Sequence, residues 1–258
     1  MERLGRRMAQ SDLQAGNSAW KTLYWLGGIA ALLAVFVFRR NLSAELMALR
    51  GLGLFFVPDM PVSVSGWFTL LQSNPLVGLT LLNVFDLFEY ALLGLIFLAV
   101  CTALWQTDRS AMLVATVCGM VGIIAYFVSN QAFALLALSE RYTAATSDIT
   151  RASFLAAGEA LLAINNPGAL YQGTGIYVCM FLVPLAGLIM SLVMLQGNIF
   201  NRATAVVGIL ANGLILFYFP VLAFAPSMLA LPFVLSAPLR VTWYFLLALK
   251  LFKLGRDL

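Results

Sequence analysis

The sequence predicts an all-α, polytopic membrane protein: a bundle of six transmembrane helices with short amphipathic helices in its outer loops. Of the 258 residues, 62% are apolar and only 10% are charged, whereas soluble domains are about 45–50% apolar and about 25% charged. A mean hydropathy of +0.94 leaves too little polar surface to cover a water-soluble globule. The composition therefore excludes a soluble enzyme, a disordered tail and a nucleic-acid-binding module.

The apolar runs predict a single membrane domain, 22–253, between a polar, basic N-terminal segment, 1–21, and a short tail, 254–258. Each run has about 17 residues or more, the minimum for a membrane-spanning helix. The predicted spans are 22–38, 76–105, 110–138, 175–195, 203–219 and 233–252.

The first run could be mistaken for a signal peptide, because a basic segment precedes it. However, Arg39 and Arg40 follow it directly and no small-residue cleavage site closes it. These features favour a retained signal anchor.

The loops predicted on the outer side, 41–75 and 139–173, contain two short helices. Residues 65–71 are expected to lie at the membrane interface, because their Trp and Phe suit the headgroup region. Ser147 is a good helix N-cap, and the apolar positions that follow recur at helical spacing up to Asn165. This pattern predicts an amphipathic helix on the membrane surface or against the bundle.

Four prolines recur every six residues near the C-terminal end: Pro220, Pro226, Pro232 and Pro238. Because proline interrupts helices, we expect 220–232 to form a broken outer turn. The triplet Ser236-Ala237-Pro238 further predicts a helix restart that would place Arg240 close to a helix N-terminus.

The orientation follows from the distribution of the 15 Lys and Arg residues. Nine lie on the side of the termini, five lie on the other side, and Arg240 lies within a span. Positive charge concentrates in cytoplasmic loops, so both termini are predicted to be cytoplasmic.

Histidine is absent from the chain. Its absence excludes histidine-ligated haem, zinc or iron and serine–histidine catalysis. The three cysteines, Cys101, Cys118 and Cys179, lie in apolar runs without a CxxC neighbour and are expected to be buried apolar side chains. We therefore expect no cofactor, no metal site and no catalytic residues.

The candidate site is the set of polar residues inside the spans. An ionisable group in hydrocarbon costs at least about 2.5–3.5 kcal/mol, so these side chains should face the bundle interior and find partners. Two interpretations remain open: an internal ion pair that fixes helix packing, or a binding site for a solute or proton. The residues are Asn83, Asp86, Glu89 and Tyr90 on the second span, Asn130 and Gln131 on the third, Asn212 on the fifth and Arg240 on the sixth.

Several short stretches of sequence resemble bacterial multi-pass membrane proteins of domain-of-unknown-function family 4386. They are the residues at 83–87, 126–130, 137–142, 173–177 and 207–212, and the resemblance extends over most of 20–253. It implies a bacterial inner (cytoplasmic) membrane location and a six-span body. It implies no activity, so no functional residues are transferred.

The expected function is non-enzymatic: binding or moving a small solute or amphiphile through the intramembrane polar cluster. The alternative is a structural or accessory subunit of a larger membrane complex. A membrane enzyme is least favoured, because no nucleophile or cofactor site accompanies Asp86 and Glu89. Stripes of small residues, such as Cys118-xxx-Gly122, Gly187-xxx-Ser191 and Thr204-xxx-Gly208, are expected to let helices approach closely within the bundle or between copies of the chain. The expected partners are the lipid bilayer and a homodimer or larger membrane complex, but no nucleic acid.

Overall fold

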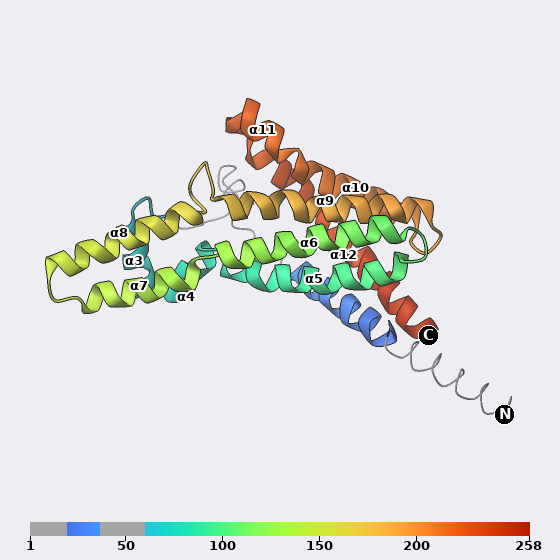
Figure 1. Ribbon diagram of the computed structural model, residues 1–258, viewed down its shortest axis with the longest axis horizontal. Coiled ribbons are helices and arrows are strands. Elements are labelled where there is room, and N and C mark those ends of the chain that lie inside the picture. The colour runs from blue at the N-terminus through green and yellow to red at the C-terminus, as the bar shows by residue number, and fades with distance from the viewer. Residues whose placement is uncertain (1–19, 37–59) are drawn as a thin grey trace.

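The computed structural model describes residues 20–36 and 60–258, and the regular elements in these ranges are all helices (Figure 1). Five of them are long and apolar enough to cross a membrane, which indicates a multi-pass membrane protein. These five are Val84–Leu104, Arg109–Ala144, Thr174–Gln196, Arg202–Phe224 and Pro226–Asp257. Residues 1–19 of the predicted N-terminal segment and 41–59 of the predicted outer loop lie outside the described residues.

The prediction of six spans is therefore wrong: the described residues contain five. The first predicted span, 22–38, is represented by a shorter apolar helix, Trp20–Phe36, and its last two residues lie outside the described part. At 1.5 Å per residue the described part of this helix is about 25 Å long, less than the roughly 30 Å of a hydrocarbon core.

The short helix Trp20–Phe36 nevertheless belongs to the bundle core. Ala30, Ala31 and Ala34 on it are buried. Its Trp25 ring lies 5.2 Å from the ring of Phe252 near the C-terminal end of the chain.

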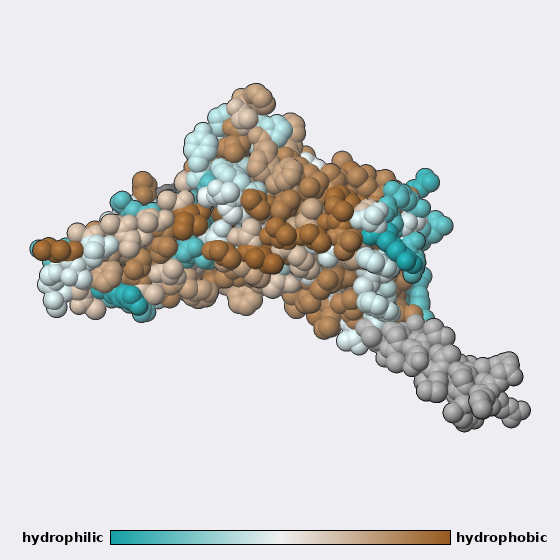
Figure 2. Space-filling model, viewed as in Figure 1, coloured by the Kyte–Doolittle hydropathy of each residue, from teal (hydrophilic) through white to brown (hydrophobic). Residues whose placement is uncertain are grey.

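The bundle core is built around α5 (Val84–Leu104), α6 (Arg109–Ser129), α9 (Thr174–Gln196), α10 (Arg202–Leu216) and α12 (Ala230–Asp257). Helix α6 packs along α9, α9 along α10, and α10 along α12. The outer surface of this bundle is hydrophobic over its middle, with hydrophilic residues gathered at the end where the C-terminus lies (Figure 2). This distribution suits a lipid environment.

The predicted small-residue stripes lie where helices meet. A side chain at Gly122 would touch Val183 of α9 at 2.8 Å, and one at Gly187 would overlap Asn212 of α10. A side chain at Gly208 would overlap Trp243 of α12. These glycines let the helices approach closely, as predicted.

A tight turn joins α5 to α6, as the sequence predicts. The carboxylate of Asp108 accepts a hydrogen bond of 3.0 Å from the backbone N–H of Ala111 and caps α6. This bond, helped by the hydroxyl of Ser110, holds the pKa of the Asp108 carboxyl below its ordinary value. The turn lies at the same end of the bundle as the α9–α10 turn and the C-terminus (Figure 1).

The second and third predicted spans, 76–105 and 110–138, are not continuous helices, which corrects the prediction. The second is divided into α4 (Pro75–Leu81) and α5 by Asn83, which has a left-handed backbone with φ 59°. The third is divided at Asn130 into α6 and α7 (Ala132–Ala144). Asparagine tolerates the left-handed conformation, and its amide can replace lost helical hydrogen bonds.

Beyond these breaks, α3 (Val64–Ser73), α4, α7 and α8 (Asp148–Ile164) form a second hydrophobic cluster, which we call the extension. It projects from the end of the bundle opposite the C-terminus (Figure 1). The segment Arg109–Ala144, which contains α6, the break and α7, has 36 residues, or about 54 Å, so it exceeds the thickness of a hydrocarbon core.

The predicted interfacial helix is α3, but its aromatic side chains are not at an interface. Trp67 and Phe68 are 0% and 1% exposed, because α7 and α8 cover them. The Phe68 ring lies 5.4 Å from that of Tyr142. The predicted amphipathic helix is confirmed as α8, with Ser147 as its N-cap and Asn165 as its C-cap.

The proline-rich region is more helical than predicted. The fifth predicted span, 203–219, continues through α11 (Tyr218–Phe224), and a short 3₁₀ turn, Pro226–Met228, precedes α12. The broken segment is therefore shorter than 220–232, and the last helix begins before 233 and continues past 252 to Asp257. Prolines are tolerated in membrane helices because neighbouring groups satisfy the backbone.

The topology can be tested by cysteine labelling at two exposed serines. Ser147 lies in the turn between α7 and α8, and Ser110 lies in the first turn of α6, at opposite ends of the α6–α7 rod (Figure 1). In a chain without its native cysteines, a membrane-impermeant maleimide should label Ser147→Cys from outside intact cells and Ser110→Cys only after permeabilisation. Equal labelling of both from one side would contradict the arrangement.

Candidate functional site

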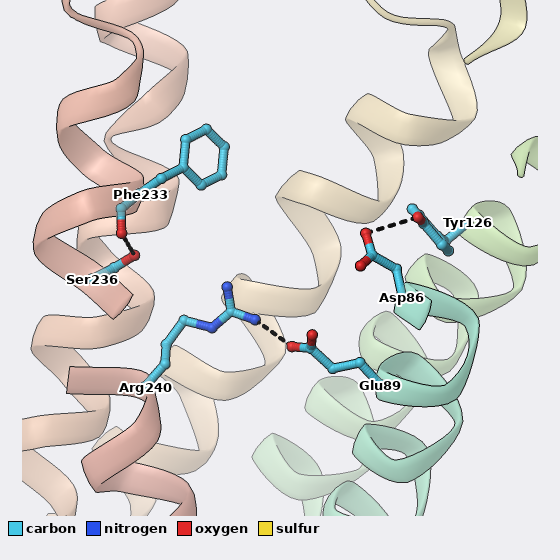
Figure 3. A network of polar contacts seen from close by, with 6 residues as sticks. All are labelled: Asp86, Glu89, Tyr126, Phe233, Ser236 and Arg240. Carbon is cyan, nitrogen blue, oxygen red and sulfur yellow. Dashed lines mark hydrogen bonds and ion pairs between the residues drawn. The ribbon is translucent and has the colours of Figure 1, made fainter. Parts of the chain in front are cut away.

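The predicted site residues fall into two groups, and the first lies where the helices break. We call it the polar joint: Asn83, Asp86, Tyr126 and Asn130. The hydroxyl of Tyr126 donates to the carboxylate of Asp86 at 2.9 Å (Figure 3). The side-chain amide of Asn130 donates to the carbonyl of Asn83 at 3.1 Å. These bonds join the two breaks across neighbouring helices.

The second group is an ion pair between α5 and α12. A guanidinium nitrogen of Arg240 donates to Glu89 Oε1 at 2.8 Å, across the space between the two helices (Figure 3). The side chain of Glu89 is 8% exposed and that of Arg240 is 21% exposed. The sequence leaves open whether Arg240 pairs with a carboxylate of the second span; in the structure it pairs with Glu89, while Asp86 bonds to Tyr126.

The prediction that Arg240 lies close to a helix N-terminus is wrong. Helix α12 begins at Ala230 and contains Pro238 in its interior. The hydroxyl of Ser236 donates to the carbonyl of Phe233 at 3.0 Å and caps nothing. Arg240 is therefore about three turns into the helix, and the exposed N–H groups of a helix start do not contribute to its surroundings.

A cavity of about 60 Å³ lies beside this ion pair. Helices α5, α9, α10 and α12 all contribute to its walls, which are mostly apolar. Sixty cubic ångströms hold a few water-sized groups. The polar side chains that line it are Tyr90, Asn212, Arg240, Trp243 and Tyr244.

Trp243, which lines the cavity, carries an unsatisfied hydrogen-bond donor that packs against Gly208 of α10. Its indole is 2% exposed, and its N–H has no hydrogen-bond partner among the described residues. Leaving a buried donor unpaired costs about 1–3 kcal/mol. The indole N–H of Trp67 also has no hydrogen-bond partner among the described residues, but Trp67 lies in the extension and does not line the cavity.

Helix α9 lacks one backbone hydrogen bond at Pro184, a residue that lines the cavity. Pro184 lies inside α9 and lines the cavity together with Met180. Proline has no N–H, so the carbonyl of Met180, four residues earlier, lacks its usual helical donor. Helix α9 therefore has one backbone carbonyl, that of Met180, without its helical bond.

The structure brings most of the predicted residues together, but not all. Tyr90 and Asn212 line the cavity, and the amide of Asn212 donates to the carbonyl of Gly208 at 2.8 Å. The amide of Gln131 instead donates to the carbonyl of Val128 at the break in the third span.

Sequence reasoning missed three aromatic residues: Tyr126, Trp243 and Tyr244. Their signal was their spacing: Trp243 and Tyr244 follow Arg240 by three and four residues, and Tyr126 precedes Asn130 by four. Residues three or four positions apart share a helix face. An aromatic residue at this distance from a buried polar residue is therefore expected to face the interior as well.

The two groups are connected by aromatic stacking. The ring centroids of Tyr90, which lines the cavity, and Tyr126, in the polar joint, are 4.3 Å apart. The arrangement forms a continuous polar and aromatic path from the polar joint to the ion pair. The polar side chains of this arrangement can donate hydrogen bonds to a small group. Among the described residues, no cluster of His, Cys, Asp and Glu could hold a metal ion.

No family model, curated protein or solved structure matches the chain. The resemblance to family 4386 therefore remains a prediction.

The ion pair should dominate stability, which can be tested by removing one or both partners. Arg240→Met leaves the Glu89 carboxylate buried and unpaired, so we expect the free energy of unfolding to fall by about 3–5 kcal/mol. Adding Glu89→Leu should recover much of this loss, because neither charge of the pair is then left. Thermal unfolding of the purified protein in detergent measures both effects.

The control is Arg151→Met, which removes an exposed ion pair with Asp148 at 3.5 Å. Exposed pairs contribute about 0–1 kcal/mol, so melting should barely change. An Arg240→Met variant that melts like the unsubstituted protein would show that Arg240 and Glu89 are not a buried pair.

Proposed function

We propose that this protein binds or moves a small solute or amphiphile inside the membrane, at the cavity beside Glu89 and Arg240, without catalysing a reaction. The observation that carries the proposal is the cavity itself. It lies among four helices that contribute to membrane spans, and Arg240, Tyr90 and Asn212 are among its lining residues. A concave, mostly apolar site with a few convergent polar groups is typical of small-molecule binding.

The space beside the ion pair favours binding over a purely structural role. Protein interiors are close-packed, and a structural ion pair is best sealed by side chains that fill the space around it. Here about 60 Å³ remains next to Arg240. A ligand that occupies this space would supply the packing contacts that the surrounding side chains lack.

We further propose that the protein lies in the cytoplasmic membrane of a bacterium with both termini cytoplasmic. The location follows from the resemblance to family 4386. The orientation is supported by the positive charges at one end of the bundle. Arg109 and Arg202 begin α6 and α10 at the end where α12 finishes with Lys253 and Arg256.

The alternative function is a structural or accessory subunit, and the extension favours it. Exposed apolar side chains occur on this part, including Ile149, which is 85% exposed, and Phe133, which is 58% exposed. A partner in a larger membrane complex, or a second copy of the chain, could cover them. If this function holds, Ile149→Asp should reduce the size of the assembly purified in mild detergent, while variants in the cavity leave that size unchanged.

The binding proposal can be tested by filling the cavity. Ile215 lines it and is 7% exposed, so Ile215→Phe should occupy part of the space and exclude the occupant. Ile124→Phe is the matched control, because Ile124 is 60% exposed on the outside of α6. Mass spectrometry of molecules that co-purify with each variant should find a compound lost only in Ile215→Phe. Equal retention in both variants, or no compound with the unsubstituted protein, would contradict the proposal.

A further inference from the structure

We infer that an anionic phospholipid binds where helix Trp20–Phe36 packs against the end of α12, with its phosphate held by Lys21 and Arg256 and its acyl chains along the apolar faces beside them. We call this place the basic seam: Lys21, Trp25, Phe252 and Arg256. The inference does not depend on the cavity or on what the cavity binds, because neither Lys21 nor Arg256 lines it.

The two helices of the basic seam run antiparallel and in close contact. A side chain at Gly28 would lie 2.8 Å from the ring of Phe252, and one at Gly255 would lie 2.9 Å from the ring of Trp25. The ring centroids of Trp25 and Phe252 are themselves 5.2 Å apart. Helix Trp20–Phe36, drawn in blue, begins at the end of the bundle where α12 finishes (Figure 1).

Helical spacing places Lys21 and Arg256 on the same side of the seam. Lys21 precedes Trp25 by four residues, and Arg256 follows Phe252 by four. Each cation therefore lies one turn beyond a ring of the contacting pair and on the same helix face as that ring. In this antiparallel register the two positions are offset by about 5 Å along the helix axes, which the long side chains of Lys and Arg can bridge.

The basic seam carries positive charge that its own helices do not balance. Lys21, Lys253 and Arg256 are exposed, and the ion pairs among the described residues involve none of them. Within 20–36 and 230–257, Asp257 is the single acidic residue, so the cations at this end outnumber it. Arg and Lys side chains bind phosphate oxygens, and basic pockets between membrane helices bind anionic headgroups.

Apolar side chains continue from these cations toward the middle of the bundle. On helix Trp20–Phe36, Ile29 and Leu33 follow Lys21 in steps of four residues and are exposed. On α12, Leu249 is exposed one turn before Lys253. A cation at the end of a lipid-facing apolar stripe matches a phospholipid, whose phosphate and acyl chains follow one another in the same order. A water-soluble phosphate would leave the apolar stripes without contacts.

The test measures lipid binding to the purified full chain in detergent by native mass spectrometry. Dioleoylphosphatidylglycerol is anionic, whereas dioleoylphosphatidylcholine has the same chains and phosphate but a cationic choline that balances the charge. Glycerol 3-phosphate supplies a phosphate without acyl chains. We expect phosphatidylglycerol to bind more tightly than phosphatidylcholine, and we expect glycerol 3-phosphate not to displace it.

The role of the two cations is tested with the double variant Lys21→Gln and Arg256→Gln. A Lys or Arg beside an anionic lipid strengthens binding about fivefold, so this variant should bind phosphatidylglycerol about 20- to 30-fold more weakly. The matched control is Arg109→Gln with Arg202→Gln. It removes the same charge from the starts of α6 and α10, at the same end of the bundle but apart from the end of α12 (Figure 1). The control should leave phosphatidylglycerol binding nearly unchanged, and all four positions are exposed, so both double variants should melt like the unsubstituted protein.

Three results would overturn the inference. Equal affinity for the two phospholipids would show that the seam does not select an anionic lipid. Displacement of phosphatidylglycerol by glycerol 3-phosphate would show a site for free phosphate. No loss of binding in the Lys21→Gln and Arg256→Gln variant, or the same loss in the control, would show that the seam is not the site. None of these results bears on the cavity, which is tested separately by Ile215→Phe.

Discussion

The pairing of Glu89 with Arg240 is the constraint on which the arrangement of this bundle depends. A lone charge within a membrane is costly, so each side chain must face the interior and reach the other. The contact at 2.8 Å therefore fixes which faces of α5 and α12 point toward one another. A cavity lined by Arg240 lies beside the pair. The same interaction that orients the helices thus contributes to the candidate site.

A second constraint separates the bundle from the extension. Asn83 and Asn130 interrupt two neighbouring helices, and the amide of Asn130 bonds to the carbonyl of Asn83. Each break would leave backbone groups without partners, and the amide supplies one of the replacements. The apolar residues on either side therefore belong to two hydrophobic clusters, although the hydropathy of the chain does not change at the breaks.

The sequence predicts the membrane class, most helix positions and, as one of two interpretations, an internal ion pair, because apolar length and the cost of buried charge are local or nearly local properties. It does not predict the breaks at Asn83 and Asn130, since an asparagine in an apolar run is compatible with a continuous helix. The burial of Trp67 depends on α7 and α8, which are distant in sequence. The cavity depends on four helices together, so no single stretch of sequence indicates it.

The central claim is that a space for a ligand exists beside the ion pair, and an experimental structure in lipid nanodiscs tests it most directly. The account predicts the Arg240 guanidinium bonded to Glu89 and non-protein density in the cavity beside this pair. The contradictory result is a structure in which α5 and α12 close together and side chains fill the space, leaving no room beside Arg240.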